Sequence, residues 1–345
     1  MQRGVKMSFY VRFVNRVKEI DSLRSWCSSQ RATPIYLYGP EGCGKTRLLK
    51  EFVSRFEEFF GEDAIAIYID ALERESLSKA FLSSKSVRIA TETLLSLVER
   101  FSGLAVGRAL AESIVTLVEK ALTKRKLEES YILIAVDDVA KAVGLDQIEL
   151  YVKWLYEAMW KLYEEYKPRA INMAVTTSEG ESLNLVLRHR HSYIALLWNL
   201  DKRGFEELFE ELNPPSSIDF ETVWRLLGGN PGKLVELKVT YGWSIDDMIK
   251  DATARLVSVA KEVRGRGLVE QVKLIIEDPD NIWHRASVEM GEAERILLRR
   301  NLIIYKGMPT IAREDVKPDK EIGIGEYYAW QIPSYREILK KILGV

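Results

Sequence analysis

The octapeptide GPEGCGKT, residues 39–46, restricts the fold of this chain more than any other feature. It matches the pattern G-x-x-x-x-G-K-[ST], which holds a phosphate when it connects a strand to a helix. The apolar run TPIYLYG (33–39) predicts a buried strand, and KTRLLKEFVSRFEEFF (45–60) has apolar residues at helical spacing. The flanks therefore favour a phosphate-binding loop over the alternative, a plain glycine-rich turn between a strand and a helix.

The residue types in this loop suit a phosphate chemically. Glycines allow backbone conformations in which successive N–H groups point at one anion, and the start of the following helix adds its positive dipole end. Lys45 supplies a cation for the β- and γ-phosphates, and Thr46 offers a hydroxyl to Mg²⁺. We expect the nucleotide to contact Gly39, Pro40, Glu41, Gly42, Cys43, Gly44, Lys45, Thr46 and Arg47.

A second acidic element follows at YILIAVDD (131–138), an apolar run that ends in two aspartates. Asp137 is placed to meet the metal, directly or through water, and Asp138 to orient and polarise the attacking water. The alternative is that both residues only cap the next helix. A glycine-rich phosphate loop upstream in the same chain favours the metal-binding interpretation.

Further apolar runs at 64–71, 170–178 and 192–200 predict three more strands, alternating with helices, and residues 76–127 read as helices without a strong strand signal. Runs that are apolar nearly throughout are typical of a parallel sheet covered on both faces, so the fold class is α/β with a five-stranded parallel sheet. The strand at 170–178 ends in VTTS, where Thr176, or Ser178 as second choice, is a candidate γ-phosphate sensor. A solvated strand end is the alternative.

The pattern changes after about residue 200. Stretches 202–212, 221–238 and 244–263 read as helices, and GGNPG (228–232) ends one helix and starts another. Helices and a two-strand element, 302–312 with 327–332, follow. We therefore expect an ATPase-type α/β core at 1–200, a helical lid at 201–262 and a winged-helix-like domain at 263–345.

These motifs together resemble the archaeal ATPase family of the AAA+/STAND division, relatives of the origin recognition ATPases. The resemblance covers about residues 10–240 and includes FVNRVKEIDSLRSW (13–26), YIDA and GGNPG. It implies an enzyme that binds and hydrolyses ATP with Mg²⁺. In that family the entry segment lies against the adenine, which implies this place for Phe13, Val14, Asn15 and Arg16. No N-K-x-D motif follows the acidic strand, which also favours adenine over guanine.

The resemblance implies two further sets of site residues. GGNPG is similar to the start of the second sensor helix, which assigns Pro231 and, as the nearest cation, Lys233 to the nucleotide. An arginine finger is expected before the fifth strand, where Arg188 and Arg190 fit; the alternative is a solvated basic loop. The chain departs from many relatives in having Asp138 where they have glutamate, and it has no clear second-sensor arginine.

The charge balance restricts the partners. With 50 basic and 51 acidic residues the chain has no global attraction to nucleic acid or anionic membrane. The apolar stretch 101–122 carries Arg108, Glu112 and Glu119 and therefore predicts an amphipathic helix rather than a membrane span. Two cysteines and the missing signal pattern indicate a cytoplasmic protein, with no membrane partner.

What the ATP cycle drives stays open between two hypotheses. A winged helix would suit a DNA-associated machine that acts on double- or single-stranded DNA. Its basic face would consist of Arg295, Arg299, Arg300 and Lys306; the alternative is that these residues are only the solvent-exposed side of a helix. A hinge at GGNPG would suit an ATP/ADP switch that acts on a protein partner or a second copy of the chain. The stretch NIWHRASVEM (281–290) predicts core packing and a turn.

Overall fold

The computed structural model describes residues 11–72, 81–83, 112, 115–116, 128, 130–138, 144, 147–177, 183, 186–188 and 190–345. Ser178 and most of the predicted helices between 84 and 127 lie outside the described residues. In the part of the chain that is described, no helix is both long and apolar enough to cross a membrane.

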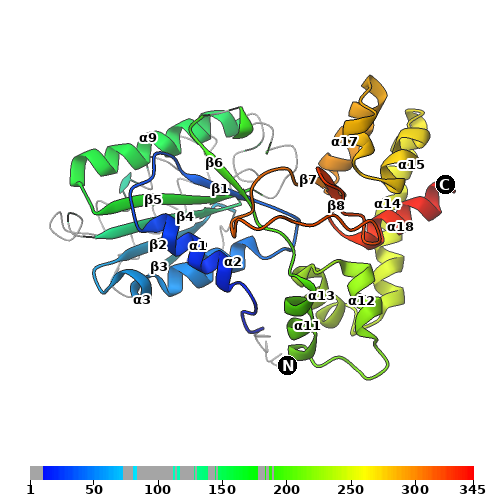
Figure 1. The fold of residues 1–345 in the computed structure, drawn as a ribbon, viewed down its shortest axis with the longest axis horizontal. Coiled ribbons are helices and arrows are strands. Elements are labelled where there is room, and N and C mark those ends of the chain that lie inside the picture. The colour runs from blue at the N-terminus through cyan, green and yellow to red at the C-terminus, as the bar shows by residue number, and fades with distance from the viewer. Residues whose placement is uncertain are drawn as a thin grey trace, which may run out of the picture.

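A twisted sheet forms the centre of the first 200 residues (Figure 1). Its strand order is β3-β2-β4-β5-β1-β6, and all neighbours are parallel except β3, which runs antiparallel to β2. The five predicted parallel strands are confirmed. The strands are β1 (Ile35–Tyr38), β2 (Ile65–Asp70), β3 (Phe81–Ser83), β4 (Tyr131–Asp137), β5 (Ala170–Thr176) and β6 (Tyr193–Leu196). The edge strand β3 lies in a stretch that the sequence predicts to be helical.

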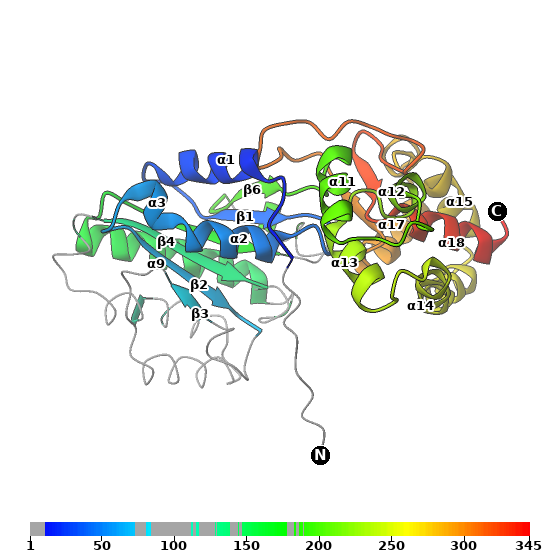
Figure 2. The same ribbon diagram turned by 90° about the horizontal axis from the view of Figure 1, so that it is seen from below.

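Helices cover both faces of this sheet, which is why its strands are apolar on both sides (Figure 2). Ile35 and Leu37 of β1 pack toward α1 (Val17–Cys27), α2 (Lys45–Ser54) and α3 (Phe56–Phe60). Tyr36 and Tyr38, the alternate residues, pack on the opposite face toward α9 (Ile148–Tyr166).

Four helices follow the sheet where the sequence predicts a lid, and we refer to them as the lid: α11 (Lys202–Glu211), α12 (Phe220–Leu227), α13 (Pro231–Val239) and α14 (Ile245–Gly265). Each begins at a side chain that accepts a backbone N–H of the first turn; these caps are Asp201, Asp219, Asn230 and Ser244. The long helix α14 packs into the lid core with Met248 and into the C-terminal core with Val259. This one helix therefore runs through both cores and joins the two regions.

The C-terminal region contains α15 (Val269–Glu277), α16 (Asn281–His284), α17 (Val288–Arg299), the antiparallel pair β7 (Ile303–Tyr305) and β8 (Tyr328–Trp330), and α18 (Pro333–Leu343). Trp330 is fully buried among these helices. Trp283, for which the sequence predicts core packing, is 63% exposed and lies beside the ring of Tyr327.

The segment between β7 and β8 is not a free loop, since it packs on the α/β core (Figure 1). Leu196 N–H donates to Pro309 O (2.9 Å) and Ile311 N–H donates to Leu196 O (2.8 Å), so Thr310 forms a parallel bridge at the outer edge of β6. Tyr38 Oη also donates to Tyr305 O over 3.1 Å. The C-terminal region is thus attached to the sheet as well as to the lid.

Candidate functional site

The glycine-rich loop follows β1 and runs directly into α2, as its flanks predict. Gly42 (φ 82°) and Gly44 (φ 102°) adopt the left-handed backbone conformation that other residues resist. A β-carbon on Gly39 would collide with the carbonyl oxygen of Leu197, and one on Gly42 would lie 2.7 Å from Asn230 Oδ1. The loop is therefore enclosed between the end of β6 and the start of α13.

Lys45 lies at the first position of α2 and is only 7% exposed. Its ammonium group donates to Gly39 O (2.9 Å) and Pro40 O (3.1 Å), within the loop itself. A phosphate oxygen would compete with these carbonyls for the same protons. Thr46, the next residue, is half-buried in the first turn of the helix.

The acidic strand end is held by two hydroxyl groups. Asp137 is 1% exposed; its Oδ2 accepts a 2.6 Å hydrogen bond from Tyr68 Oη, and its Oδ1 accepts the hydroxyl of Thr176. Thr176 lies opposite Leu37 in the register of β1 and β5, so β5 carries it between the loop strand and β4. The carboxyl ends of parallel strands are where such sheets bind ligands.

Asp138 leaves the strand with φ 53°, and its N–H donates to Thr176 Oγ1 over 3.0 Å. This bond fixes the backbone of Asp138 next to the buried Asp137–Thr176 pair. Its side chain lies at a half-buried position, where a water molecule has access.

Sequence reasoning missed Tyr68. Burial, followed by the charge of Asp137, raises the pKa of Tyr68 far above its usual value, so its hydroxyl stays a proton donor. Its signal in the sequence is weak, since Tyr68 is simply one of the alternating residues of β2.

Oxygen donors at this end suit Mg²⁺. Mg²⁺ is usually bound through one or two protein oxygens together with substrate phosphates and waters, and Thr46 and Asp137 supply a hydroxyl and a carboxylate. Among the described residues, no three or more histidine, cysteine, aspartate or glutamate side chains lie close enough together to hold a metal ion by themselves. Thr46 and Asp137 are thus the residues that would hold Mg²⁺.

A cavity of about 310 Å³ adjoins the loop. The entry segment, the loop and the lid each contribute walls, and the residues lining it are Val11, Arg12, Phe13, Val14, Arg16, Gly42, Cys43, Gly44, Arg47, Leu200, Leu208, Pro231, Gly232 and Val235. The volume suits a small ligand group such as a purine base. Phe13, Val14, Arg16 and Pro231, which the resemblance implies, therefore meet here, while Val11, Arg12, Leu200, Leu208, Gly232 and Val235 were not predicted.

Arg16 lines this cavity and also acts as a clamp, because its side chain binds backbone carbonyls of two separate segments. It is 7% exposed and donates to Cys43 O (2.9 Å) and Trp198 O (2.7 Å), while its other nitrogen pairs with Glu19 (2.6 Å). Asn15, by contrast, does not line the cavity: its amide donates to Asp201 Oδ1 at the start of the lid, over 2.9 Å.

The remaining predicted cations lie elsewhere. Lys233 is bonded to Glu236 Oε2 (2.5 Å) and lines a different cavity, together with Glu41. Arg188 is exposed and lies 3.8 Å from Glu149 Oε1; Arg190 is also exposed. Both arginines precede Tyr193, which pairs with the start of β1, whereas the loop follows the end of β1. The structure does not bring them to Lys45 of the same chain.

Comparison with known proteins identifies relatives. A family model described as an ATPase domain predominantly from Archaea matches residues 13–237. An uncharacterised ATP-binding protein of Pyrococcus abyssi is 23% identical over 281 residues, which cover 78% of this chain and 84% of that protein. Among solved structures, the ORC2 protein of Aeropyrum pernix in ADPNP–ADP complexes has a TM-score of 0.39 at 13% identity, covering 98% of this chain and 96% of its own. A katanin structure has a TM-score of 0.34 at 13% identity, with 64% of each chain covered.

Proposed function

The chain belongs to the family of ATPase domains found predominantly in archaea and is an ATPase, and from this we propose that its ATP cycle switches the position of the lid and the C-terminal region relative to the α/β core. A protein partner, or a second copy of the chain, then responds to the new position. Membership of the family implies the ATPase activity but not this switch. The support for the switch comes from the contacts that the phosphate-binding loop makes with the lid and the C-terminal region.

The contact that carries the proposal joins Glu41 to Gln331. The backbone N–H of Glu41, in the loop, donates to Gln331 Oε1 over 2.8 Å, and Gln331 directly follows β8 with 2% exposure. Its own side-chain nitrogen donates to Ile303 O in β7 over 3.2 Å. The C-terminal strand pair is thus bonded to the loop that is expected to hold the phosphates.

The lid holds the same loop from another direction. Asn230, which is fully buried, donates to Glu41 O (2.8 Å) and to Asn199 Oδ1 (3.0 Å). Asn199 in turn donates to Gln331 O (3.3 Å), and Gly232 N–H donates to Gly42 O (3.0 Å). A buried polar group left without its partner costs about 1–3 kcal/mol, so a shift of the loop must rearrange the whole network.

Within this proposal each residue of the site has a role. Lys45 binds phosphate oxygens, and Thr46 and Asp137 would hold Mg²⁺, which would supply positive charge to offset that of the phosphates. Tyr68 and Thr176 orient Asp137. Asp138 orients the water that attacks the γ-phosphorus as the bond to the leaving β-phosphate oxygen breaks.

The predicted basic face for DNA gains little support. Lys306 is 8% exposed, its ammonium group donates to Val316 O (2.7 Å), and burial lowers its pKa. Arg299 and Arg300 both bond to Glu262, at 2.6 and 3.1 Å. Phosphate contacts need free cations on one face, so a protein partner is favoured over DNA.

Small-angle X-ray scattering with Mg-ADP and with a non-hydrolysable ATP analogue tests the switch. We expect the two profiles of the wild type to differ, and the profiles of Lys45→Ala, which cannot grip the phosphates, to coincide. Identical wild-type profiles at saturating nucleotide would rule the switch out. Gel shifts with double- and single-stranded DNA over a salt series test the hypothesis of a DNA-associated machine. Binding at low salt would support that hypothesis.

The exposed arginines support an interface between copies. Arg188 and Arg190 lie away from the loop of their own chain, as a finger that acts on a neighbouring copy would. Turnover per molecule should then rise with protein concentration, and Arg190→Ala should abolish that rise. Turnover independent of concentration would contradict the role of a second copy.

A further inference from the structure

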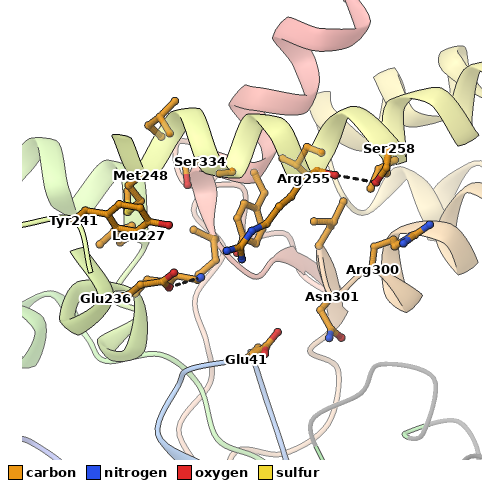
Figure 3. Close-up of a pocket in the computed structure, with 18 residues that line it drawn as sticks. Glu41, Leu227, Glu236, Tyr241, Met248, Arg255, Ser258, Arg300, Asn301 and Ser334 are labelled. Carbon is orange, nitrogen blue, oxygen red and sulfur yellow. Dashed lines mark hydrogen bonds and ion pairs between the residues drawn. The ribbon is translucent and has the colours of Figure 1, made fainter. Parts of the chain in front are cut away.

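A second cavity, of about 400 Å³, lies between the lid and the C-terminal region (Figure 3). Its apolar walls come from both sides: Leu227, Met248 and Leu256 from α12 and α14, and Leu302 and Ile332 next to β7 and β8. Glu41 of the phosphate-binding loop also lines it. The cavity therefore touches all three parts of the molecule.

Three cationic side chains line this cavity, and two of them are paired with a carboxylate. Lys233 is bonded to Glu236 (2.5 Å), and Arg300 to Glu262 (3.1 Å). Arg255 projects from α14 into the cavity (Figure 3), and its guanidinium group makes no ion pair with any described residue. Arg255 is exposed to solvent, so this unpaired cation lies beside the apolar walls rather than enclosed by them, which suits a ligand with one anionic group and an apolar body.

We propose that this cavity binds a small organic anion with an apolar body, of the class of medium-chain carboxylates and aromatic sulfonates. The anionic group pairs with Arg255, and the apolar body packs against Leu227, Met248 and Leu256. Such a ligand bridges α14 of the lid and the strands of the C-terminal region. Its binding does not depend on the proposed switch, although any effect on turnover would rest on it.

The fluorescent sulfonate 1-anilinonaphthalene-8-sulfonate tests the site, with Mg-ADP present at saturation to fill the nucleotide cavity. We expect saturable enhancement at one equivalent, and displacement by decanoate. Decan-1-ol, which has the same apolar body without the charge, should displace the probe about tenfold less well or worse, because a charge-assisted hydrogen bond is lost. Absent saturable enhancement, or equal displacement by the two competitors, overturns the proposal.

Three variants locate the binding. Arg255→Gln should weaken the probe about tenfold or more and remove the difference between decanoate and decan-1-ol. Ala252→Trp fills the cavity from the same helix and should abolish binding. Lys261→Gln changes an exposed cation of α14 outside the cavity and should bind as the wild type does. Wild-type affinity in Arg255→Gln and Ala252→Trp, with unchanged melting curves, places the probe elsewhere and refutes the assignment.

Discussion

Tyr68 Oη donates a 2.6 Å hydrogen bond to Asp137 Oδ2, from one strand of the sheet to its neighbour. With the hydroxyl of Thr176 on the other oxygen, both oxygens of the buried carboxylate have a protein donor. The carboxylate is thereby held in one orientation at the end of β4. Loss of a group that orients a metal-binding carboxylate typically lowers metal affinity about 10- to 100-fold.

The first prediction concerns Tyr68→Phe. Loss of the hydroxyl leaves Asp137 Oδ2 without its donor, so the Mg²⁺ concentration for half-maximal ATPase activity should rise about 10- to 100-fold, while nucleotide affinity without metal changes little. Titration of turnover with Mg²⁺ measures this. Tyr36→Phe is the matched control, since the buried hydroxyl of Tyr36 has no partner among the described residues. Equal Mg²⁺ dependence in the two variants would refute the role of Tyr68.

The second prediction concerns Asp138→Asn. An amide cannot polarise the attacking water as a carboxylate does, so kcat should fall about 10²- to 10⁴-fold while ATP affinity is retained. Single-turnover measurements with labelled ATP, together with equilibrium binding, separate the two quantities. Turnover equal to that of the wild type would show that Asp138 has no role in activating water.

The sheet and part of the site could be predicted because their signals are local. Buried parallel strands read as apolar runs, and the loop and the acidic strand end each lie within eight consecutive residues. The strand β3 was missed because three residues pair with β2 only through the tertiary fold. Trp283 was misplaced because an apolar residue in a short helix does not reveal whether another element covers it.

The less local parts of the site could not be predicted. The cavity beside the phosphate-binding loop takes Leu208 and Val235 from α11 and α13, whose apolar pattern says only that they face the core of these helices. Lys233 was assigned to the nucleotide by its distance from GGNPG, yet Glu236 lies one helical turn further on and binds it. Gln331, which contacts the loop, has no sequence signal, because the contact spans 290 positions.

The third prediction concerns Arg16→Lys. Nη2 of Arg16 donates to both Cys43 O and Trp198 O while Nη1 pairs with Glu19, and the single nitrogen of a lysine cannot reproduce this planar fork, so the loop should lose part of its support. We expect a loss of about 1–3 kcal/mol in unfolding free energy and weaker ADP binding. Denaturant titration and calorimetry measure the two effects. Arg24→Lys, at an exposed position of α1, is the control, and similar losses in both variants would contradict the clamp.

The last prediction concerns pH and Glu262. Hydrogen bonding by Arg300 is the largest cause that lowers the pKa of Glu262, and the charge of Arg299 adds to it. A carboxyl whose pKa is lower in the folded state stabilises the fold above its unfolded pKa, and this contribution disappears as the pH falls through the folded pKa.

Glu262→Gln should therefore lower the Tm at pH 7, by an amount equivalent to about 0.5–1 kcal/mol since the arginines are partly exposed to solvent. The difference from the wild type should shrink as the pH falls below 4.5, the ordinary pKa of a glutamate side chain, and vanish once the pH lies below the lowered pKa of Glu262 in the folded state. Thermal melts between these extremes measure it. Glu270→Gln is the control, because Glu270 is 77% exposed and lies 3.9 Å from Lys273. A Tm difference for Glu262→Gln that stays constant over this range would show that its arginine contacts do not stabilise the fold.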